Sequence, residues 1–246
     1  MKPPAFIRGI GYLLTGLHLL TTPSLRRFVL APLLVGTLLF VSGSWYALSH
    51  ILAWSSWLNS FLPSWLQWME WILVPLLFGS VGILFFTSLG IVANLIGAPF
   101  NALLAQQVEI HLIGTFDTAR QAQPQGLWES VFPTVHSEIQ KILYYIIRAI
   151  PLLLLFVLPV VNVAAPFIWI FFTSWMNAFQ YADFPMSNHQ FNDKQILAKL
   201  REERLLSLGF GAATLLLTLV PIVNLLAMPA AVAGATAMWV KEWRGK

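Results

Sequence analysis

The fold is decided by a long apolar stretch at residues 149–182, AIPLLLLFVLPVVNVAAPFIWIFFTSWMNAFQYA, which contains no charged residue. Exposing that much apolar surface to water would cost tens of kcal/mol, at about 25 cal/mol per Å², so the stretch belongs in lipid. Pro159 and Pro166 flank Asn162 near its middle. Because a proline inside a helix removes an amide donor and clashes with the preceding turn, the stretch predicts a helix that is broken within the bilayer.

A second charge-free run, residues 205–240, has a similar interruption at residues 221–229, where Pro221 and Pro229 flank Asn224. Two broken hydrophobic segments in corresponding positions of one chain are typical of transport proteins. The pair of segments therefore predicts a transporter rather than a protein with simple membrane anchors.

Composition supports a membrane protein. The chain is 58% hydrophobic and 10% charged, whereas soluble domains carry about 25% charged residues. We therefore expect residues 1–246 to form one membrane domain. The basic residues are scattered among apolar ones, so nothing indicates nucleic-acid binding. The sequence has no cysteine, no metal-ligand spacing among its five histidines and no hydrolase or nucleotide motif, so we expect no metal, no cofactor and no enzyme activity.

Hydrophobic periodicity divides the chain into helices. Residues 1–22 predict an amphipathic helix at the membrane interface, because one face is apolar (Ile7, Ile10, Leu13, Leu14, Leu17 and Leu20) and Arg8 lies on the other. Spanning helices are expected at 25–52 and 71–96, joined by a tryptophan-rich loop at 53–70. A turn at 98–101 then leads to cytoplasmic helices within 101–148, with a loop at 115–127. Residues 194–204 predict a solvated amphipathic helix.

The distribution of Lys and Arg predicts the topology. Four lie in residues 1–27, none in 53–70 and four in 183–204, so only the 53–70 loop is expected outside the cytoplasm, and both termini are expected inside. The halves of each broken segment would span only about 15–24 Å of an approximately 30 Å hydrocarbon core. We therefore predict two re-entrant hairpins, 149–182 and 205–240. The predicted fold class is an all-α integral membrane protein with two spanning helices, two re-entrant hairpins and amphipathic surface helices.

Arg26 and Arg27 form the sharpest candidate site. They lie in the first turn of a predicted helix, where positive side chains oppose the macrodipole and where amides have no intrahelical partner. Ser24 is the expected N-cap, and with Leu25 it completes the site. Two guanidinium groups and the free amides of residues 26–28 would bind a tetrahedral oxyanion. The alternative is an interfacial anchor that contacts lipid phosphate.

Other polar residues are candidates for the path or for coupling. Glu109 and His189 could form a proton-coupling group, because histidine titrates near neutral pH, or they could form a surface or interhelical ion pair. Arg148, at the mouth of the first hairpin, could attract an anion or extend its charge to the interface. Asn162 and Asn224 could line a permeation path or satisfy carbonyls that the prolines leave free.

Four stretches carry a family resemblance: residues 23–34 (PSLRRFVLAPLL), 98–105 (APFNALLA), 175–185 (WMNAFQYADFP) with Asn188 and His189, and 228–239 (MPAAVAGATAMW). In these the chain resembles CysZ, the bacterial inner-membrane sulfate permease family, which is related to the etoposide-induced membrane proteins of eukaryotes. The resemblance implies proton-dependent sulfate uptake that feeds cysteine synthesis, half-penetrating hairpins and a homo-oligomer, a dimer or larger. It also implies that Arg26 and Arg27 bind sulfate.

Two other functions remain open. The chain could be an anion channel without proton coupling, in which case Glu109 and His189 would lose that role. It could also be a membrane-shaping or assembly factor whose hairpins wedge one leaflet of the bilayer. The second alternative requires the hairpins and the amphipathic helix, but it does not require the arginine pair.

Overall fold

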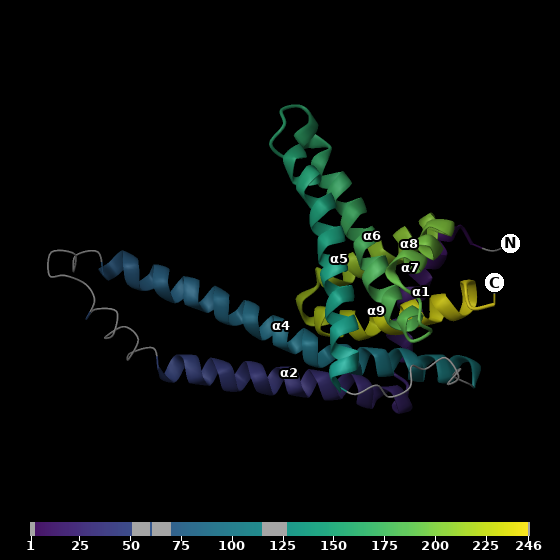
Figure 1. The fold of residues 1–246 in the computed structure, drawn as a ribbon, viewed down its shortest axis with the longest axis horizontal. Coiled ribbons are helices and arrows are strands. Elements are labelled where there is room, and N and C mark those ends of the chain that lie inside the picture. The colour runs from purple at the N-terminus through teal and green to yellow at the C-terminus, as the bar shows by residue number, and fades with distance from the viewer. Residues whose placement is uncertain (1–2, 51–59, 61–69, 115–126, 246) are drawn as a thin grey trace. The chain divides into compact units, whose positions relative to one another are not determined.

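The computed structural model describes residues 3–50, 60, 70–114 and 127–245, and their secondary structure is entirely helical (Figure 1). The all-α prediction is therefore confirmed for these residues. Of the predicted loop at 115–127, only residue 127 is among the described residues. Of the tryptophan-rich loop at 53–70, only Ser60 and Glu70 are. The elements in chain order are α1 Ala5–Leu19, α2 Pro23–Ser49, α4 Glu70–Ile113, α5 Leu127–Leu155, the 3-10 helix η3 Val161–Val163, α6 Ala165–Ser187, α7 Asp193–Glu202, α8 Arg204–Thr218 and α9 Pro221–Glu242.

The chain forms two compact units, each of which is described by itself. One contains Met1–Val29 and Asn101–Lys246, and the other contains Leu30–Phe100. In the second unit, α2 and α4 carry large apolar side chains that are exposed, including Leu38, Trp45 and Ile83. In lipid such surface carries no penalty, whereas in water it would be unusual for a monomer.

Two helices of the described residues are long and apolar enough to cross a membrane, Pro23–Ser49 and Val223–Glu242. The first supports the predicted span at 25–52. The second overlaps the predicted hairpin 205–240 and extends two residues beyond it, and most of it is buried inside the structure. The other predicted span, 71–96, is helical as part of α4.

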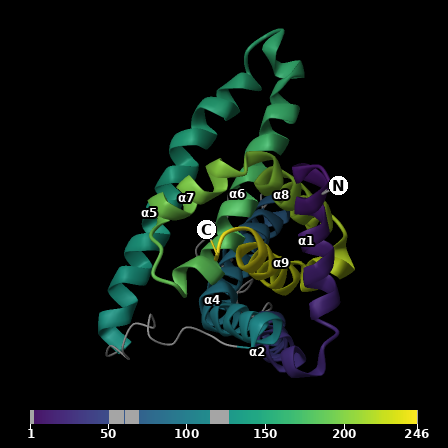
Figure 2. The ribbon, with the colours of Figure 1, turned by 90° about the vertical axis from the view of Figure 1, so that its right-hand side faces the viewer.

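The core of the first unit is formed by helices α1, α6, α8 and α9. Helix α1 packs against α8 and α9, and α6 packs against the same two helices (Figure 2). The crossings are close because glycines meet backbone atoms. A Cβ atom at Gly9 would lie 2.1 Å from the Leu206 carbonyl oxygen, and one at Gly16 would lie 2.1 Å from the Ala230 carbonyl oxygen. Small residues therefore set the contact distance of α1.

Helix α1 buries a narrow face against the other helices. The buried residues are Gly9, Leu13, Gly16 and Leu19, whereas Ile7 and Leu14 of the expected apolar face are exposed. A hydropathy pattern gives glycine no weight, although glycine permits the closest backbone contact, so the sequence does not show Gly9 and Gly16 as contact residues. Whether Ile7 and Leu14 lie at a membrane interface stays a prediction.

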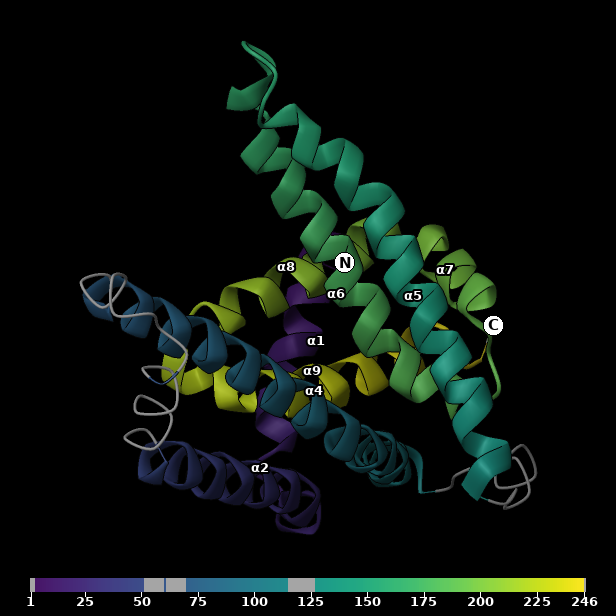
Figure 3. The same ribbon diagram turned by 60° about the vertical axis from the view of Figure 1, so that its left-hand side comes forward.

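The first broken segment forms the turn of a helical hairpin. Helix α5 ends at Leu155, η3 occupies Val161–Val163, and α6 begins at Ala165 and runs back along α5 (Figure 3). Val160 has a positive φ of 72° and is 89% exposed at the tip. The break therefore lies where the prolines place it. Its depth in a bilayer stays a prediction.

The second break is shorter than predicted and lies earlier. Helix α8 ends at Thr218 and α9 begins at Pro221, so the interruption is residues 219–220. The prediction of a break across 221–229 was wrong, because α9 continues through Asn224 and Pro229. Pro221 lies in the first turn, where its missing amide costs nothing. Pro229 is surrounded by buried neighbours, Ala227 and Ala230, whose packing holds the helix despite one lost hydrogen bond.

Two further boundaries differ from the prediction. Helix α4 is continuous from Glu70 to Ile113 with Pro99 inside it, so the expected turn at 98–101 is absent. Helix α5 continues beyond Arg148 to Leu155 instead of ending there. The amphipathic helix expected at 194–204 is α7. It starts with a capping box between Asn192 and Gln195 and buries Ile196, Leu197 and Leu200.

Candidate functional site

The arginine pair lies in the first turns of α2, which begins earlier in the sequence than predicted. Helix α2 begins at Pro23, so Ser24 is inside the first turn and is not the N-cap. The amides of Leu25 and Arg26 donate to the Thr22 carbonyl at 3.0 and 3.3 Å. The prediction of free amides at residues 26–28 was therefore wrong for Arg26, because the preceding turn already supplies an acceptor.

The two guanidinium groups are exposed and have no carboxylate partner among the described residues. Arg26 Nε donates to the Thr21 carbonyl oxygen at 3.1 Å, and the Arg27 guanidinium lies over the Phe28 ring at 4.8 Å. Leu25 is only 1% exposed and anchors the turn, so its side chain cannot contact a bound ion. Ser24 is exposed beside the pair. The site therefore offers two unpaired cations and one hydroxyl to an anion.

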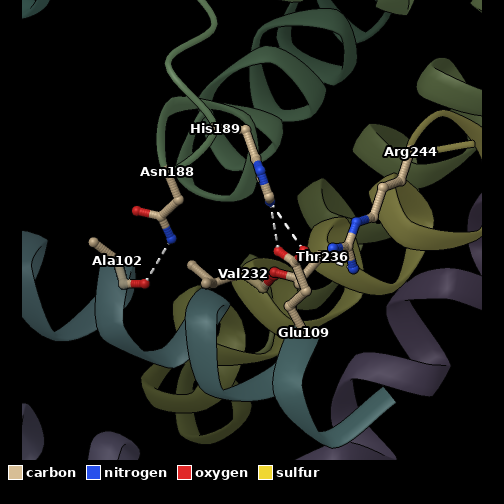
Figure 4. Close-up of polar contacts among 7 residues, drawn as sticks. All are labelled: Ala102, Glu109, Asn188, His189, Val232, Thr236 and Arg244. Carbon is tan, nitrogen blue, oxygen red and sulfur yellow. Dashed lines mark hydrogen bonds and ion pairs between the residues drawn. The ribbon is translucent and has the colours of Figure 1, made fainter. Parts of the chain in front are cut away.

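A second polar cluster is buried where the end of α4 meets the segments that follow α6 and α9 (Figure 4). His189 Nε2 lies 2.8 Å from Glu109 Oε2, and Arg244 Nη1 lies 3.0 Å from Glu109 Oε1. The Glu109 side chain is 1% exposed, that of His189 5% and that of Arg244 25%. The structure thus brings together Glu109 and His189, which are far apart in sequence, and adds the guanidinium group of Arg244.

The surroundings hold His189 in place. The neighbouring Asn188 donates its Nδ2 hydrogen to the Ala102 carbonyl oxygen of α4 at 2.9 Å, and the Trp239 ring lies 5.6 Å from the His189 ring. Sequence reasoning missed Arg244, because it treated the basic tail only as a topology signal. The spacing offered one clue: Arg244 follows buried α9 directly, where a cation needs a partner.

A third cluster, also missed, ties α1 to the ends of α7 and α9. Arg8 lies 3.4 Å from a Glu242 oxygen and 3.6 Å from a Glu203 oxygen. The Tyr12 hydroxyl donates to Glu242 at 2.7 Å. Burial raises the pKa of Tyr12 above its ordinary value, and the hydrogen bond to Glu242 adds to the shift. Arg8 was predicted on the polar face of α1, but its carboxylate partners could not be read from the pattern.

The remaining candidate residues lie apart from the arginine pair and from both ion-pair clusters. The Arg148 guanidinium lies 3.6 Å above the ring of Tyr144 on its own helix and is exposed. Asn162 in η3 and Asn224 in α9 are both exposed. Among the described residues, no group of His, Asp and Glu could hold a metal ion.

The described helices and these clusters define a class: a helical protein with membrane-type apolar surfaces, an exposed pair of arginines and a buried ion-pair cluster. Comparison with known proteins gives the family. The family described as sulfate transporter CysZ/etoposide-induced protein 2.4 matches residues 12–229, and the chain belongs to this family.

Curated relatives cover nearly the whole chain. The sulfate transporter CysZ of Salmonella typhimurium is 41% identical over 239 residues, which is 97% of this chain and 94% of the relative. The proteins of the same name from Salmonella paratyphi A and Salmonella enteritidis match to the same extent. The family is therefore one of transporters and not of enzymes, and the resemblance stated from the sequence is confirmed.

Proposed function

We propose that the protein transports sulfate across the bacterial inner membrane and that Arg26 and Arg27 bind the ion. One observation carries the proposal: two consecutive arginines are exposed at a helix start without a carboxylate partner in the described structure. The name of the Salmonella relatives, sulfate transporter, agrees with an oxyanion at such a site.

The chemistry of sulfate suits this pair. Each guanidinium presents a planar fork of N–H donors, and charge-assisted hydrogen bonds to an oxyanion are about twice as strong as neutral ones. Two adjacent cations at the positive end of a helix repel each other and the macrodipole. A doubly charged anion relieves both repulsions. Arg26 Nε is already committed to Thr21, so its terminal Nη groups would hold sulfate.

The hairpins would shape the route. We infer that α5–η3–α6 and α8–α9 enter the bilayer from the cytoplasmic side and turn inside it, with both termini cytoplasmic. The tip of the first hairpin supports this, because Val157, Val160 and Val163 are exposed there and water would penalise them. Asn162, Asn224 and Arg148 would line or flank the path, and protomers of a homo-oligomer would complete it.

Coupling to protons would use the buried cluster. Glu109 and His189 are within hydrogen-bond distance, at 2.8 Å, so a proton would pass directly between the imidazole and the carboxylate. Sulfate that enters the cell in this way would supply sulfur for cysteine biosynthesis. Both statements extend the proposal beyond the sulfate site itself.

Uptake of radiolabelled sulfate by liposomes that contain the purified protein tests the function. We expect uptake above that of empty liposomes, and a drop of about tenfold or more for Arg26→Gln/Arg27→Gln, since each charge-assisted hydrogen bond contributes about 1.5–3 kcal/mol. The matched control is Arg201→Gln/Arg204→Gln, which removes the same charge from exposed positions. Equal uptake by the two double variants would contradict the assignment of the site to Arg26 and Arg27. Wild-type uptake no higher than that of empty liposomes would contradict the proposed transport function.

An uncoupled anion channel is the second candidate. One observation favours it: Arg244 already balances the charge of Glu109 at 3.0 Å, which is the arrangement of a structural ion pair. A channel would transport sulfate at the same initial rate with or without a pH gradient across the liposome membrane. A coupled transporter would transport it faster when protons flow in the same direction.

A further inference from the structure

Three buried N–H donors around the end of α9 have no hydrogen-bond acceptor in the described structure. They are Arg8 Nε, Trp239 Nε1 and Trp243 Nε1. A fourth buried donor there, Arg244 Nη1, makes no hydrogen bond either, but it lies 3.0 Å from Glu109 Oε1 as an ion pair and is not counted with them. The two tryptophan side chains are nearly inaccessible, with Trp239 3% and Trp243 2% exposed. Leaving a buried donor unsatisfied costs about 1–3 kcal/mol, and native proteins rarely tolerate it. Three such donors in one place require an acceptor.

The three donors belong to one region. Trp239, Glu242 and Trp243 are three and four residues apart, so they lie on the same side of the last turns of α9. Glu242 contacts Arg8 and Tyr12 of α1. On the other flank, the Trp239 ring faces the ring of His189. The region therefore lies between the Glu242 cluster and the Glu109 cluster.

Protein groups do not supply the acceptor. The Phe191 ring is edge to face with Trp239, with ring centroids 5.2 Å apart and an interplanar angle of 74°. An aromatic face accepts an indole N–H only weakly, and this ring could serve one of the two indoles at most. Glu242 already accepts from Tyr12 and faces Arg8.

The charges of the two clusters do not favour an anion such as sulfate. The two clusters contain three carboxylates, Glu109, Glu203 and Glu242, and two guanidinium groups, Arg8 and Arg244. With a neutral His189 the sum is already negative, and with a protonated His189 it is zero. Neither sum is positive, so the two clusters would not balance the charge of a doubly charged anion, and a small neutral molecule is the acceptor that fits.

We propose that ordered water is bound in the interior at this end of α9, accepts the three N–H groups and links the Glu242 cluster to the Glu109 cluster. A water molecule has two acceptor sites and two hydrogens, and buried waters typically make about three hydrogen bonds to otherwise unsatisfied groups. The distances agree, because the Arg8 contacts of 3.4 and 3.6 Å are longer than direct charge-assisted bonds of about 2.7–2.9 Å. This inference does not depend on sulfate transport.

Brief X-ray radiolysis of the protein in detergent tests the proposal, because hydroxyl radicals formed from bound water label the side chains next to it. Met238 is the internal control, since methionine reacts readily and Met238 is 0% exposed. We expect oxidation of Trp239 and Trp243 with Met238 unmodified. Labelling of none of the three would overturn the proposal. Labelling of all three would also overturn it, because it would show that bulk water enters the whole region.

The variant Trp243→Phe sharpens the test, since it keeps an aromatic ring and removes one donor. If both indoles donate to the same water, the occupancy of that water falls and oxidation of Trp239 drops severalfold. Unchanged oxidation of Trp239 would contradict a shared site. An unfolding temperature close to that of the wild type would show that the variant is folded. If it is not, Trp239→Phe with oxidation of Trp243 as the readout makes the same comparison.

Discussion

Replacing Gly16 by alanine should separate α1 from α9. The added Cβ would lie 2.1 Å from the Ala230 carbonyl oxygen and 2.6 Å from the Gly234 amide nitrogen. Both are backbone atoms of a buried helix, so no side-chain rotation can relieve the contact. Helix α1 would have to move by about 1.3 Å to lengthen the 2.1 Å contact to an ordinary separation of 3.4 Å, which would also disturb the contacts of Arg8 and Tyr12 with Glu242.

The magnitude follows from overpacking. Extra methyl groups in a well-packed core typically cost about 1–3 kcal/mol, and a backbone crossing belongs at or above the upper end. For a chain of this size each kcal/mol lowers the unfolding temperature by about 2–4 °C, so we expect a drop of about 6–12 °C. Gly11→Ala is the matched control on the same helix, because its Cβ would meet nothing within 4 Å. It should be neutral or stabilise by up to about 1 kcal/mol through helix propensity.

The assay is thermal unfolding in detergent, followed by tryptophan fluorescence, with the wild type and both variants at the same concentration. If Gly16→Ala unfolds at the same temperature as Gly11→Ala, then α1 does not cross α9 at this glycine. Limited proteolysis at the N-terminus provides a second readout, because a displaced α1 should be cut faster in Gly16→Ala alone.

Three other predictions concern the polar clusters and α7, and the first two use the same thermal assay. Glu109→Gln leaves Arg244 and His189 without their carboxylate and should lower the free energy of unfolding by about 2–4 kcal/mol. The control Lys199→Gln breaks an exposed ion pair with Glu202 and should lower it by less than about 1 kcal/mol. Equal losses in the two variants would contradict a buried cluster. The pKa of Tyr12 is raised in the folded protein, so its proton stabilises the fold below about pH 10, and this stability is lost as the pH rises above that value. Tyr12→Phe should therefore show a smaller fall of the unfolding temperature at alkaline pH than the wild type. An equal fall in the two proteins would argue against this role of Tyr12. Asn192→Ala removes the capping box of α7 and should cost about 1 kcal/mol, measured as faster amide exchange at the start of α7 with little change elsewhere.

Parts of the fold could be predicted because they rest on local physics. The absence of charge over residues 149–182 requires an apolar environment, and the prolines around Asn162 require a break, which the structure places between α5 and α6. The second break was placed wrongly, because a proline pattern alone does not distinguish a helix start, as at Pro221, from a tolerated interior position, as at Pro229. That distinction depends on tertiary packing.

The site was predictable to the same limited degree. A consecutive arginine pair is visible in the sequence, and so are Glu109 and His189 as titratable residues in apolar surroundings. The partnership of Arg244 with Glu109 is a long-range contact, and no periodicity reports it. The glycine crossings of α1 were missed for the same reason: the important feature of Gly9 and Gly16 is what faces them.

The central claim is that Arg26 and Arg27 bind sulfate. Its most direct test is the binding of radiolabelled sulfate to the purified protein by scintillation proximity, for the wild type, Arg26→Gln/Arg27→Gln and the charge-matched Arg201→Gln/Arg204→Gln. Saturable binding to the wild type and the control, displaced by unlabelled sulfate and weakened about tenfold or more in the first variant, is the predicted result. Sulfate binding of wild-type strength in Arg26→Gln/Arg27→Gln would contradict the claim.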